Sequence, residues 1–342
     1  MIKIDWWLVL PALCLTLIGL LVLRSIAPQL LPNQLLFAAI SVVFYLLFSL
    51  LDYQVLKSLH LPIFIISILF LLSPYFLGVH SRGAKRWLQI GQYTLQPSEI
   101  AKPFLLNTFS SLAGSSVLLV SSLVPPWLII FFQPDLGTSL VIFSGWSVIF
   151  LSRFSLRSTV SFMVFVAVLT IPVYLFVLRP YQKDRLRTFI DPYHDPLGQG
   201  YHVIQSQIAV GSGQFLGRGL GHGTQSQLRF LPERHTDFIF ASLSEELGFV
   251  GVFFVITAFC LLFWRIYSIS KRQISLTASY FCLSSLCLLA FQAFVNIAMN
   301  MGLAPITGIT LPFLSYGGSS LLSLGIHLGI ISSISQTASS QV

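Results

Sequence analysis

The chain has 342 residues, of which 55% are hydrophobic and only 9% are Asp, Glu, Lys or Arg, and its mean hydropathy is +0.84. This composition excludes a soluble globular protein, in which about a quarter of the residues are charged. We therefore expect an all-α polytopic membrane protein that forms a single integral membrane domain over residues 1–342.

Long stretches without charged side chains predict the membrane spans. Because a spanning helix needs about 20 apolar residues, the stretches 103–134 and 273–342 must each hold more than one helix. We expect interruptions near residue 114, in a polar sequence, and near residue 304, in Met-Gly-Leu-Ala-Pro. About ten transmembrane helices are then predicted, at 6–24, 34–51, 56–77, 98–112, 116–132, 136–151, 158–178, 238–264, 277–301 and 309–334.

Basic residues predict the orientation of these helices. With the N-terminus inside, the positive-inside rule is met by the basic residues of the short loops, Lys3, Lys57, Arg153, Arg157, Arg265, Lys271 and Arg272. A large extracytoplasmic loop, about 179–236, then lies between helices seven and eight, and its residues 201–210 predict an amphipathic surface helix. Arg82, Lys85 and Arg86 lie outside, against the rule, so we expect an acidic ligand at the outer face.

The outer sequence 78–97 predicts a short β-turn structure with an interfacial Trp87. The Pro-Ser dipeptide at its end is typical of a helix start, with Ser98 as the N-cap. Glu99 and Lys102 then share one face of a helix that enters the bilayer. Because an intramembrane lysine needs a partner or a watery cavity, they form either a structural pair or, as we prefer, part of a substrate cavity.

Three further sequences each allow two interpretations. Asp135, in Gln-Pro-Asp-Leu-Gly-Thr, either caps the next helix or joins a site. The six glycines of 211–223 lack the spacing of a dinucleotide-binding loop and favour a mobile loop that lets backbone approach a substrate. The sequence 311–320, Leu-Pro-Phe-Leu-Ser-Tyr-Gly-Gly-Ser-Ser, either packs helices closely or breaks a helix that lines a cavity.

Residues 229–248, RFLPERHTDFIFASLSEELG, concentrate ionisable groups at the mouth of an apolar segment. Asp237 is either a helix cap or a site residue. The site is favoured by three ionisable neighbours: Arg229, Arg234 and His235. Glu245 and Glu246 lie about 12 Å deeper at the rise of a helix. Either the helix faces a wet cavity, or the true span starts after Glu246.

Five motifs, in this order, resemble the shape, elongation, division and sporulation (SEDS) family of peptidoglycan glycosyltransferases: GAKRWLQIGQYTLQPSEIAK, QPDLGTSL, YHVIQSQIAVGSG, GTQSQLRFLPERHTDFIFASLSEELG and LPFLSYGGSSLL. The resemblance covers about residues 80–325. It is stronger to the elongation type, RodA, than to the division type, FtsW, although Gly-Leu-Gly at 219–221 is nearer the division type. It implies a ten-helix bundle with a large loop between helices seven and eight.

The resemblance also implies the chemistry. The substrate would be lipid II, a disaccharide-peptide on undecaprenyl diphosphate, at the outer face of the bacterial cytoplasmic membrane. Polymerisation inverts the anomeric carbon, which needs one general base, and Asp237 is its predicted position. No cofactor is required by this scheme, and a divalent cation such as Mg²⁺ stays open, with ligands unknown. The residues expected to bind substrate are Lys85, Arg86, Trp87, Glu99, Lys102, Asp135, Arg185, Arg234 and His235.

The expected partners are lipid II, membrane lipid and, by the family resemblance, a class B penicillin-binding protein with transpeptidase activity, while nucleic acid is not expected. Two alternatives stay open: a lipid II transporter and a non-catalytic scaffold for a transpeptidase. A transporter should show symmetry between sequence halves, which is not found. A scaffold gives no reason for Asp237 among arginines.

Overall fold

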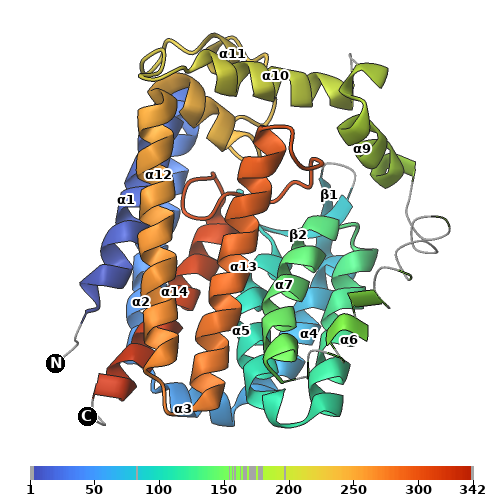
Figure 1. The fold of residues 1–342 in the computed structure, drawn as a ribbon, viewed down its shortest axis with the longest axis vertical. Helices are drawn as coiled ribbons and strands as arrows, with labels where there is room; N and C mark the ends of the chain where they lie inside the picture. The colour runs from blue at the N-terminus through green and yellow to red at the C-terminus, as the bar shows by residue number, and fades with distance from the viewer. Residues whose placement is uncertain are drawn as a thin grey trace.

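The computed structural model describes residues 4–81, 84–153, 155, 157, 159–161, 163, 164, 168, 175, 180–195 and 198–339. Long helices run side by side in a bundle, and both termini lie at one end of it (Figure 1). By the predicted orientation, we call the opposite end the outer end.

The bundle contains α1 (Trp6–Ile26), α2 (Leu31–Leu50), α4 (His60–Leu77), α5 (Pro97–Ser111), α6 (Ser116–Phe132), α7 (Leu136–Arg153), α12 (Ile239–Lys271), α13 (Leu276–Asn300) and α14 (Gly318–Ser339). Shorter elements are α3 (Tyr53–Ser58), α9 (Pro180–Ile190), α10 (Gln199–Ser212), α11 (Thr224–Gln227), β1 (Gly78–Ser81), β2 (Ala84–Ile90) and β3 (Tyr93–Leu95). In the described part of the chain, seven helices are long and apolar enough to cross a membrane, namely α1, α2, α4, α7, α12, α13 and α14. The predicted helix 158–178 falls mostly outside the described residues, so the count of ten stays a prediction.

Helix α14 forms the buried centre of the bundle, where α2, α5, α12 and α13 pack against it. Two glycines explain the close contact with α2. A Cβ at Gly325 would overlap the backbone of Ser41, and a Cβ at Gly329 would lie 2.7 Å from the Tyr45 carbonyl oxygen. Small residues of this kind let helix backbones approach where lipid supplies no hydrophobic drive for association.

The structure corrects the predicted starts of two helices. Helix α5 begins at Pro97 with Gln96 as its cap, so Ser98 is not the N-cap. Proline is favoured at the first helical position because its fixed φ fits the helix and its missing N–H costs no bond there. Helix α14 begins at Gly318 and not at residue 309, because the chain turns through Pro312 before it.

Helix α12 is interrupted near its outer end. Gly248 has φ 63° and ψ −162°, a conformation open essentially only to glycine, so the helix divides into 239–247 and 249–271. Of the two interpretations of Glu245 and Glu246, this supports the second, in which the membrane span starts after Glu246.

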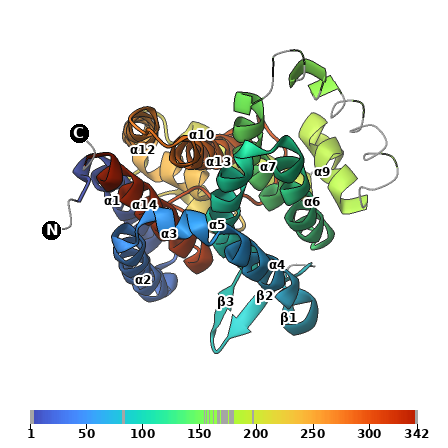
Figure 2. The same cartoon turned by 90° about the horizontal axis from the view of Figure 1, so that it is seen from below.

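The predicted turn structure at 78–97 is a three-stranded antiparallel sheet in the order β1-β2-β3. Leu88 of β2 pairs with Gly78 on one side and Leu95 on the other. The β2–β3 turn contains Gly91, whose φ is 62°. Figure 2 shows this sheet projecting beside the bundle, next to α4.

Helices α10 and α11 of the predicted outer loop lie across the outer end of the bundle (Figure 1). Helix α10 confirms the helix predicted at 201–210 and packs on α12 and α13 (Figure 1). Ser206 Oγ donates to the Asn300 carbonyl at 2.8 Å and fixes α10 on the end of α13. Helix α10 therefore covers the outer end of the bundle, the end at which Asp135 and Asp237 lie.

Candidate active site

The chain between α13 and α14, residues 301–317, lies at the outer end and is called here the outer segment. It holds the beginning of the His-Thr-Asp motif by two backbone contacts. Ser315 Oγ donates to the Thr236 carbonyl at 2.8 Å, and the Tyr316 N–H donates to the His235 carbonyl at 2.8 Å. The His235 and Tyr316 rings also meet edge to face, with centroids 5.7 Å apart.

Asp237 is fixed through its own backbone. Its carbonyl accepts from the side-chain amides of Asn296 and Asn300, each at 3.0 Å. Asn296 also donates to the Ile309 carbonyl at 2.7 Å, so α13 ties the aspartate to the outer segment. The half-buried carboxylate faces Gly308, because a Cβ added at Gly308 would lie 3.6 Å from its oxygen.

The helix-cap interpretation of Asp237 is not supported. Helix α12 begins at Ile239 with Phe238 at the cap position, one residue beyond Asp237. The aspartate therefore belongs to the turn that precedes the helix.

Asp135 is the centre of a polar cluster in which its predicted role as a helix cap is confirmed, while a role in substrate binding stays a prediction. It caps α7, since Thr138 donates to it from the backbone at 3.2 Å and from Oγ1 at 3.0 Å. It also pairs with Arg86 at 3.2 Å and accepts from Gln96 Nε2 at 2.7 Å. The Gln96 N–H donates to Ser319 Oγ at 2.8 Å, which connects the cluster to the start of α14.

The outer segment lies beside both Asp237 and the start of α7, which Asp135 caps, so it brings the two aspartates to one end of the bundle. A Cβ at Gly137 would lie 2.9 Å from both the Thr307 carbonyl oxygen and the Ile309 side chain, so the start of α7 presses on this segment. From the other side, Arg185 of α9 donates to the Ile306 carbonyl at 3.2 Å. Residues far apart in the sequence thus meet on a single stretch of irregular backbone.

Glu99 and Lys102 form the predicted pair, with Lys102 Nζ 2.6 Å from Glu99 Oε1. Both residues are buried, Lys102 to 2% exposure and Glu99 to 8%. This geometry is that of a structural ion pair inside the bundle. Its participation in a substrate cavity stays a prediction.

The two remaining predicted residues of this region, Lys85 and Trp87, lie on β2. Lys85 Nζ donates to the Tyr75 carbonyl at 2.8 Å, which joins β2 to the end of α4. Trp87 is half-buried, and its indole N–H has no hydrogen-bond partner among the residues that the structure describes.

Arg234 is the basic residue of the motif that stands nearest to Asp237 in the sequence. One of its terminal nitrogens donates to the Ile26 carbonyl at 3.0 Å. Burial, and then the positive charge of Arg229, lowers the pKa of its guanidinium from the ordinary arginine value. No carboxylate within the described ranges forms an ion pair with Arg234, so its positive charge is available to an anionic ligand.

Glu245 is fully buried and holds the start of α11. Its two carboxylate oxygens accept from the backbone N–H groups of Gln225 at 2.8 Å and Ser226 at 2.9 Å. Thr224 Oγ1 adds a third, longer contact at 3.4 Å. A negative charge at a helix N-terminus is favourable because it meets unpaired N–H groups and the positive end of the dipole.

Glu246 joins the same loop to α1. One of its oxygens accepts from Ser25 Oγ at 2.6 Å, from Gln227 Nε2 at 3.1 Å and from the Gly221 N–H at 3.1 Å. These contacts assign the two glutamates a structural task that the sequence left open.

The glycine-rich loop is anchored to α12, where a mobile loop was predicted. The N–H groups of Arg218 and Gly219 donate to the carbonyls of Glu245 and Glu246 at 2.9 and 3.0 Å. The glycines serve this close approach: Gly217 has φ 80°, and a Cβ there would overlap the backbone of Glu246.

Two observations bear on ligands. In the described part of the chain, no group of three or more His, Cys, Asp or Glu side chains could hold a metal ion. A small, mainly apolar cavity of about 170 Å³ lies between α2, the β2–β3 part of the sheet and α14. Its lining residues are Phe37, Ile90, Tyr93, Thr94, Leu95, Ser319 and Leu322.

Sequence reasoning missed the polar residues that position the two aspartates: Gln96, Asn296, Asn300, Ser315 and Ser319. Asn296 and Asn300 did carry a signal, because two amides spaced four residues apart in an apolar helix lie on one face. Nothing local marked Gln96 or Ser319, which meet only through the fold.

The bundle and its outer end define a class of protein. It is an integral membrane protein in which two aspartates, Asp135 and Asp237, lie beside irregular backbone at one end of the bundle. The chain belongs to the FtsW, RodA and SpoVE family of cell cycle proteins, whose family model matches residues 12–340.

Relatives and solved structures agree with this assignment. The chain is 44% identical over 283 residues to the peptidoglycan glycosyltransferase MrdB of Escherichia coli K12, covering 80% of this chain and 76% of MrdB. It is 34% identical to a probable peptidoglycan glycosyltransferase FtsW of Trichlorobacter lovleyi, with 89% and 83% covered.

The fold is similar to a chain of a peptidoglycan synthase complex that coordinates polymerization and crosslinking, at a TM-score of 0.85, 29% identity and 99% coverage of both chains. It is also similar to the rod shape determining protein RodA of Thermus thermophilus, at a TM-score of 0.73 and 26% identity, with 97% and 96% covered. The similarity is thus greater to the RodA type than to the FtsW type, as predicted from the motifs.

Proposed function

We propose that this protein is a RodA-type peptidoglycan glycosyltransferase that polymerises lipid II at the outer face of the bacterial cytoplasmic membrane. The observation that carries the proposal is the placement of Asp237. It stands just before a membrane-spanning helix, its backbone is held by two asparagines, and its half-buried carboxylate faces the outer segment. A fixed backbone with a carboxylate still open to solvent is what a general base requires.

The reaction needs one base and no covalent nucleophile. The acceptor hydroxyl oxygen forms a bond to the anomeric carbon of the donor while the bond from that carbon to the diphosphate oxygen breaks. The hydroxyl proton passes to the Asp237 carboxylate, and the lipid diphosphate leaves with the electron pair. Inversion at carbon follows from the single displacement.

The leaving diphosphate needs positive charge. Arg234 supports this role best, because it precedes Asp237 by three residues and its charge is not matched by a carboxylate among the described residues. Arg86 and Lys102 are already paired with carboxylates, which weakens their attraction for a diphosphate. Mg²⁺ stays a prediction, and no step of this scheme depends on it.

The apolar cavity beside Ser319 supports an apolar substrate tail. It opens between helices and the hairpin at the level of the Asp135 cluster, because Ser319 lines the cavity and also accepts from Gln96. A lipid-linked sugar could then keep its tail among helices while its diphosphate lies at the outer rim.

We further infer a transpeptidase partner of the class B penicillin-binding type. The support is similarity to a chain of a complex that coordinates polymerization and crosslinking. Joining strand growth to crosslinking requires both activities within reach of one glycan strand.

The test is purified protein with fluorescent lipid II, scored for glycan strands by gel. We expect strands from the natural chain and a strand yield lower by about 10²-fold or more from Asp237→Asn. A transporter would instead move lipid II across vesicles without forming strands, and a scaffold would do neither alone. Strand formation by Asp237→Asn at the natural rate would contradict the assignment of the base.

A further inference from the structure

The glycine-rich loop between α10 and α11 turns an apolar tip outward. Phe215 is 65% exposed and Leu216 is 75% exposed. The backbone beneath them is held firmly, since the N–H groups of Phe249 and Val250 donate to the carbonyls of Gln214 and Phe215 at 2.9 and 3.2 Å. The tip therefore presents two large apolar side chains from a fixed support.

The tip is continuous with the exposed apolar side of α12. The Phe215 ring stacks on Phe249 with centroids 5.9 Å apart and planes 20° apart. Phe249 meets Phe253 at 6.5 Å, and Phe253 meets Phe254 at 6.2 Å. All three helix residues are more than half exposed. An aromatic row thus runs from the loop onto the spanning part of α12 without a polar residue in it.

The helix sets the depth of this row. At the cytoplasmic side, exposed Trp264 meets Trp7 at 6.5 Å, as expected of an interfacial aromatic belt. Phe249 lies about 22 Å farther along the helix at 1.5 Å per residue. Because the hydrocarbon core is about 30 Å thick, Phe249 and the Phe215 ring beside it fall inside its outer part.

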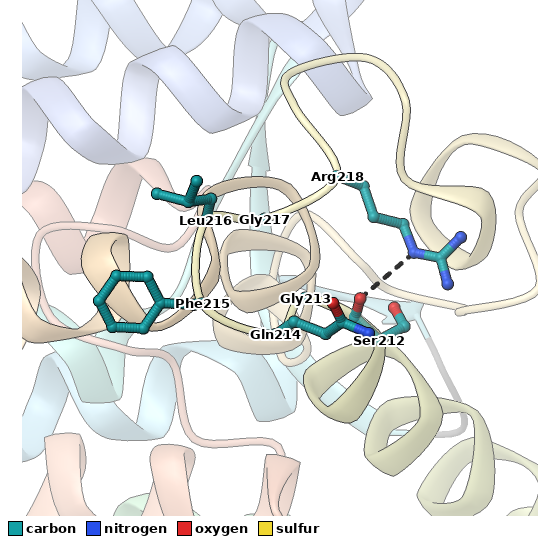
Figure 3. A pocket seen from close by; sticks show the side chains of 7 residues that line it. All are labelled: Ser212, Gly213, Gln214, Phe215, Leu216, Gly217 and Arg218. Atoms are coloured by element: carbon teal, nitrogen blue, oxygen red, sulfur yellow. Dashed lines mark hydrogen bonds between the residues drawn. The ribbon is translucent and has the colours of Figure 1, made fainter.

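A positive charge stands on the other side of the tip. Residues Ser212–Arg218 enclose a pocket of about 370 Å³, and Figure 3 shows Phe215 and Leu216 pointing away from Arg218. Arg218 is exposed, and its Nε donates to the Ser212 carbonyl at 3.4 Å. No carboxylate in the described part of the chain pairs with it. An arginine at the edge of the hydrocarbon core lies at the level of lipid phosphates.

We propose that loop 213–219 is a membrane-docking element that binds an anionic phospholipid of the outer leaflet. Phe215 and Leu216 insert among the acyl chains, and Arg218 pairs with the phosphate. Because the loop is bonded to α12, this lipid contact holds the chain that leads to Asp237 at a fixed depth in the membrane. The proposal concerns lipid and does not depend on the sugar chemistry.

The depth of the tip is tested by a nitroxide on Leu216→Cys in lipid nanodiscs of phosphatidylethanolamine and phosphatidylglycerol. We expect oxygen to relax the label several-fold more strongly than a water-soluble nickel chelate, as it does for a reference label at Ile256→Cys on α12. Size-exclusion chromatography checks folding of the background, in which the native cysteines are alanine: Cys14, Cys260, Cys282 and Cys287.

Two outcomes of that measurement overturn the proposal. A label relaxed mainly by nickel would place the tip in water. A label reached by neither reagent would show that protein, and not lipid, covers the tip.

The phosphate contact is tested by native mass spectrometry of protein released from the same nanodiscs. Arg218→Gln should lose the most strongly retained phosphatidylglycerol. The matched control is Arg187→Gln, an arginine whose side chain is 63% exposed on α9 and paired with Asp184, and it should keep that lipid. Equal retention by both variants would overturn the assignment of Arg218 to a lipid phosphate.

Discussion

Glu245 and Glu246 in α12 differ in burial from Asp237, which lies just before this helix. Glu245 and Glu246 are 0% and 1% exposed, and together they accept from backbone and side-chain donors on α1, α11 and the glycine-rich loop. Asp237 is half-buried, and its backbone carbonyl accepts from Asn296 and Asn300. Within one short stretch of sequence, buried carboxylates fasten the loop, while a carboxylate at the rim faces the site.

This difference teaches how to separate structure from chemistry in a charged cluster. A carboxylate that is buried and accepts from fixed backbone donors, as Glu245 does, stabilises the fold. A half-buried carboxylate at the rim, such as Asp237, lies where a substrate at the outer face can reach it. The following predictions test that separation, from the largest expected effect to the smallest.

Asp237→Asn should reduce lipid II polymerisation by about 10²–10⁴-fold, the usual contribution of a general base. Asparagine keeps the backbone carbonyl that Asn296 and Asn300 hold, so the melting temperature should change little. Strand yield and thermal unfolding in detergent are measured together. The matched control is Asp52→Asn, at a cytoplasmic helix cap that asparagine also satisfies, and it should retain activity.

Gly248→Ala should destabilise the protein by about 4 kcal/mol. Alanine is strained in this backbone conformation, and its Cβ would overlap the Gly217 backbone. Thermal unfolding reports the loss. Gly211→Ala is the control, since a Cβ there meets nothing within 4 Å and the residue lies in helix α10. It should stabilise by about 0.5–1 kcal/mol, and equal destabilisation by both would refute this account of the α12 interruption.

Glu245→Ala should cost about 2–4 kcal/mol, because the buried N–H of Ser226 and the partly buried N–H of Gln225 lose their acceptor. The free energy of local opening, measured by hydrogen exchange in residues 221–237, should fall by the same amount. Glu245→Gln keeps one acceptor oxygen and should lose about half as much. Unchanged exchange in Glu245→Ala would mean that the loop is held by other contacts.

Asp135→Ala should cost about 1–2 kcal/mol, because α7 loses its cap and Arg86 loses its partner. Asp135→Asn keeps the cap acceptor and should lose only the ion pair, so it should be the more stable variant. If both variants are equally stable but only Asp135→Asn polymerises lipid II, the cap matters through the site and not through folding.

Much of the fold was predictable because its signals are local. Apolar stretches predicted nearly every described span, and the i, i+3 spacing of Glu99 and Lys102 predicted their ion pair. Errors arose at helix ends: Ser98 was expected as a cap, yet Pro97 starts the helix. Irregular backbone decided the start of α14 as well, because Pro312 and the residues around it leave the helical path.

By itself, the sequence determined the membrane class, nearly all described spans, the β-turn structure at 78–97 and the motif that carries Asp237. Composition and short-range spacing suffice for these features because they act within one segment. Only the tertiary structure decided which carboxylates are buried and which one lies half-buried at the rim. Ser25 and Glu246 lie 221 positions apart and bond at 2.6 Å, and the outer segment collects both aspartate clusters. Such pairings depend on where whole helices pack, since burial and donor geometry are properties of the assembled bundle.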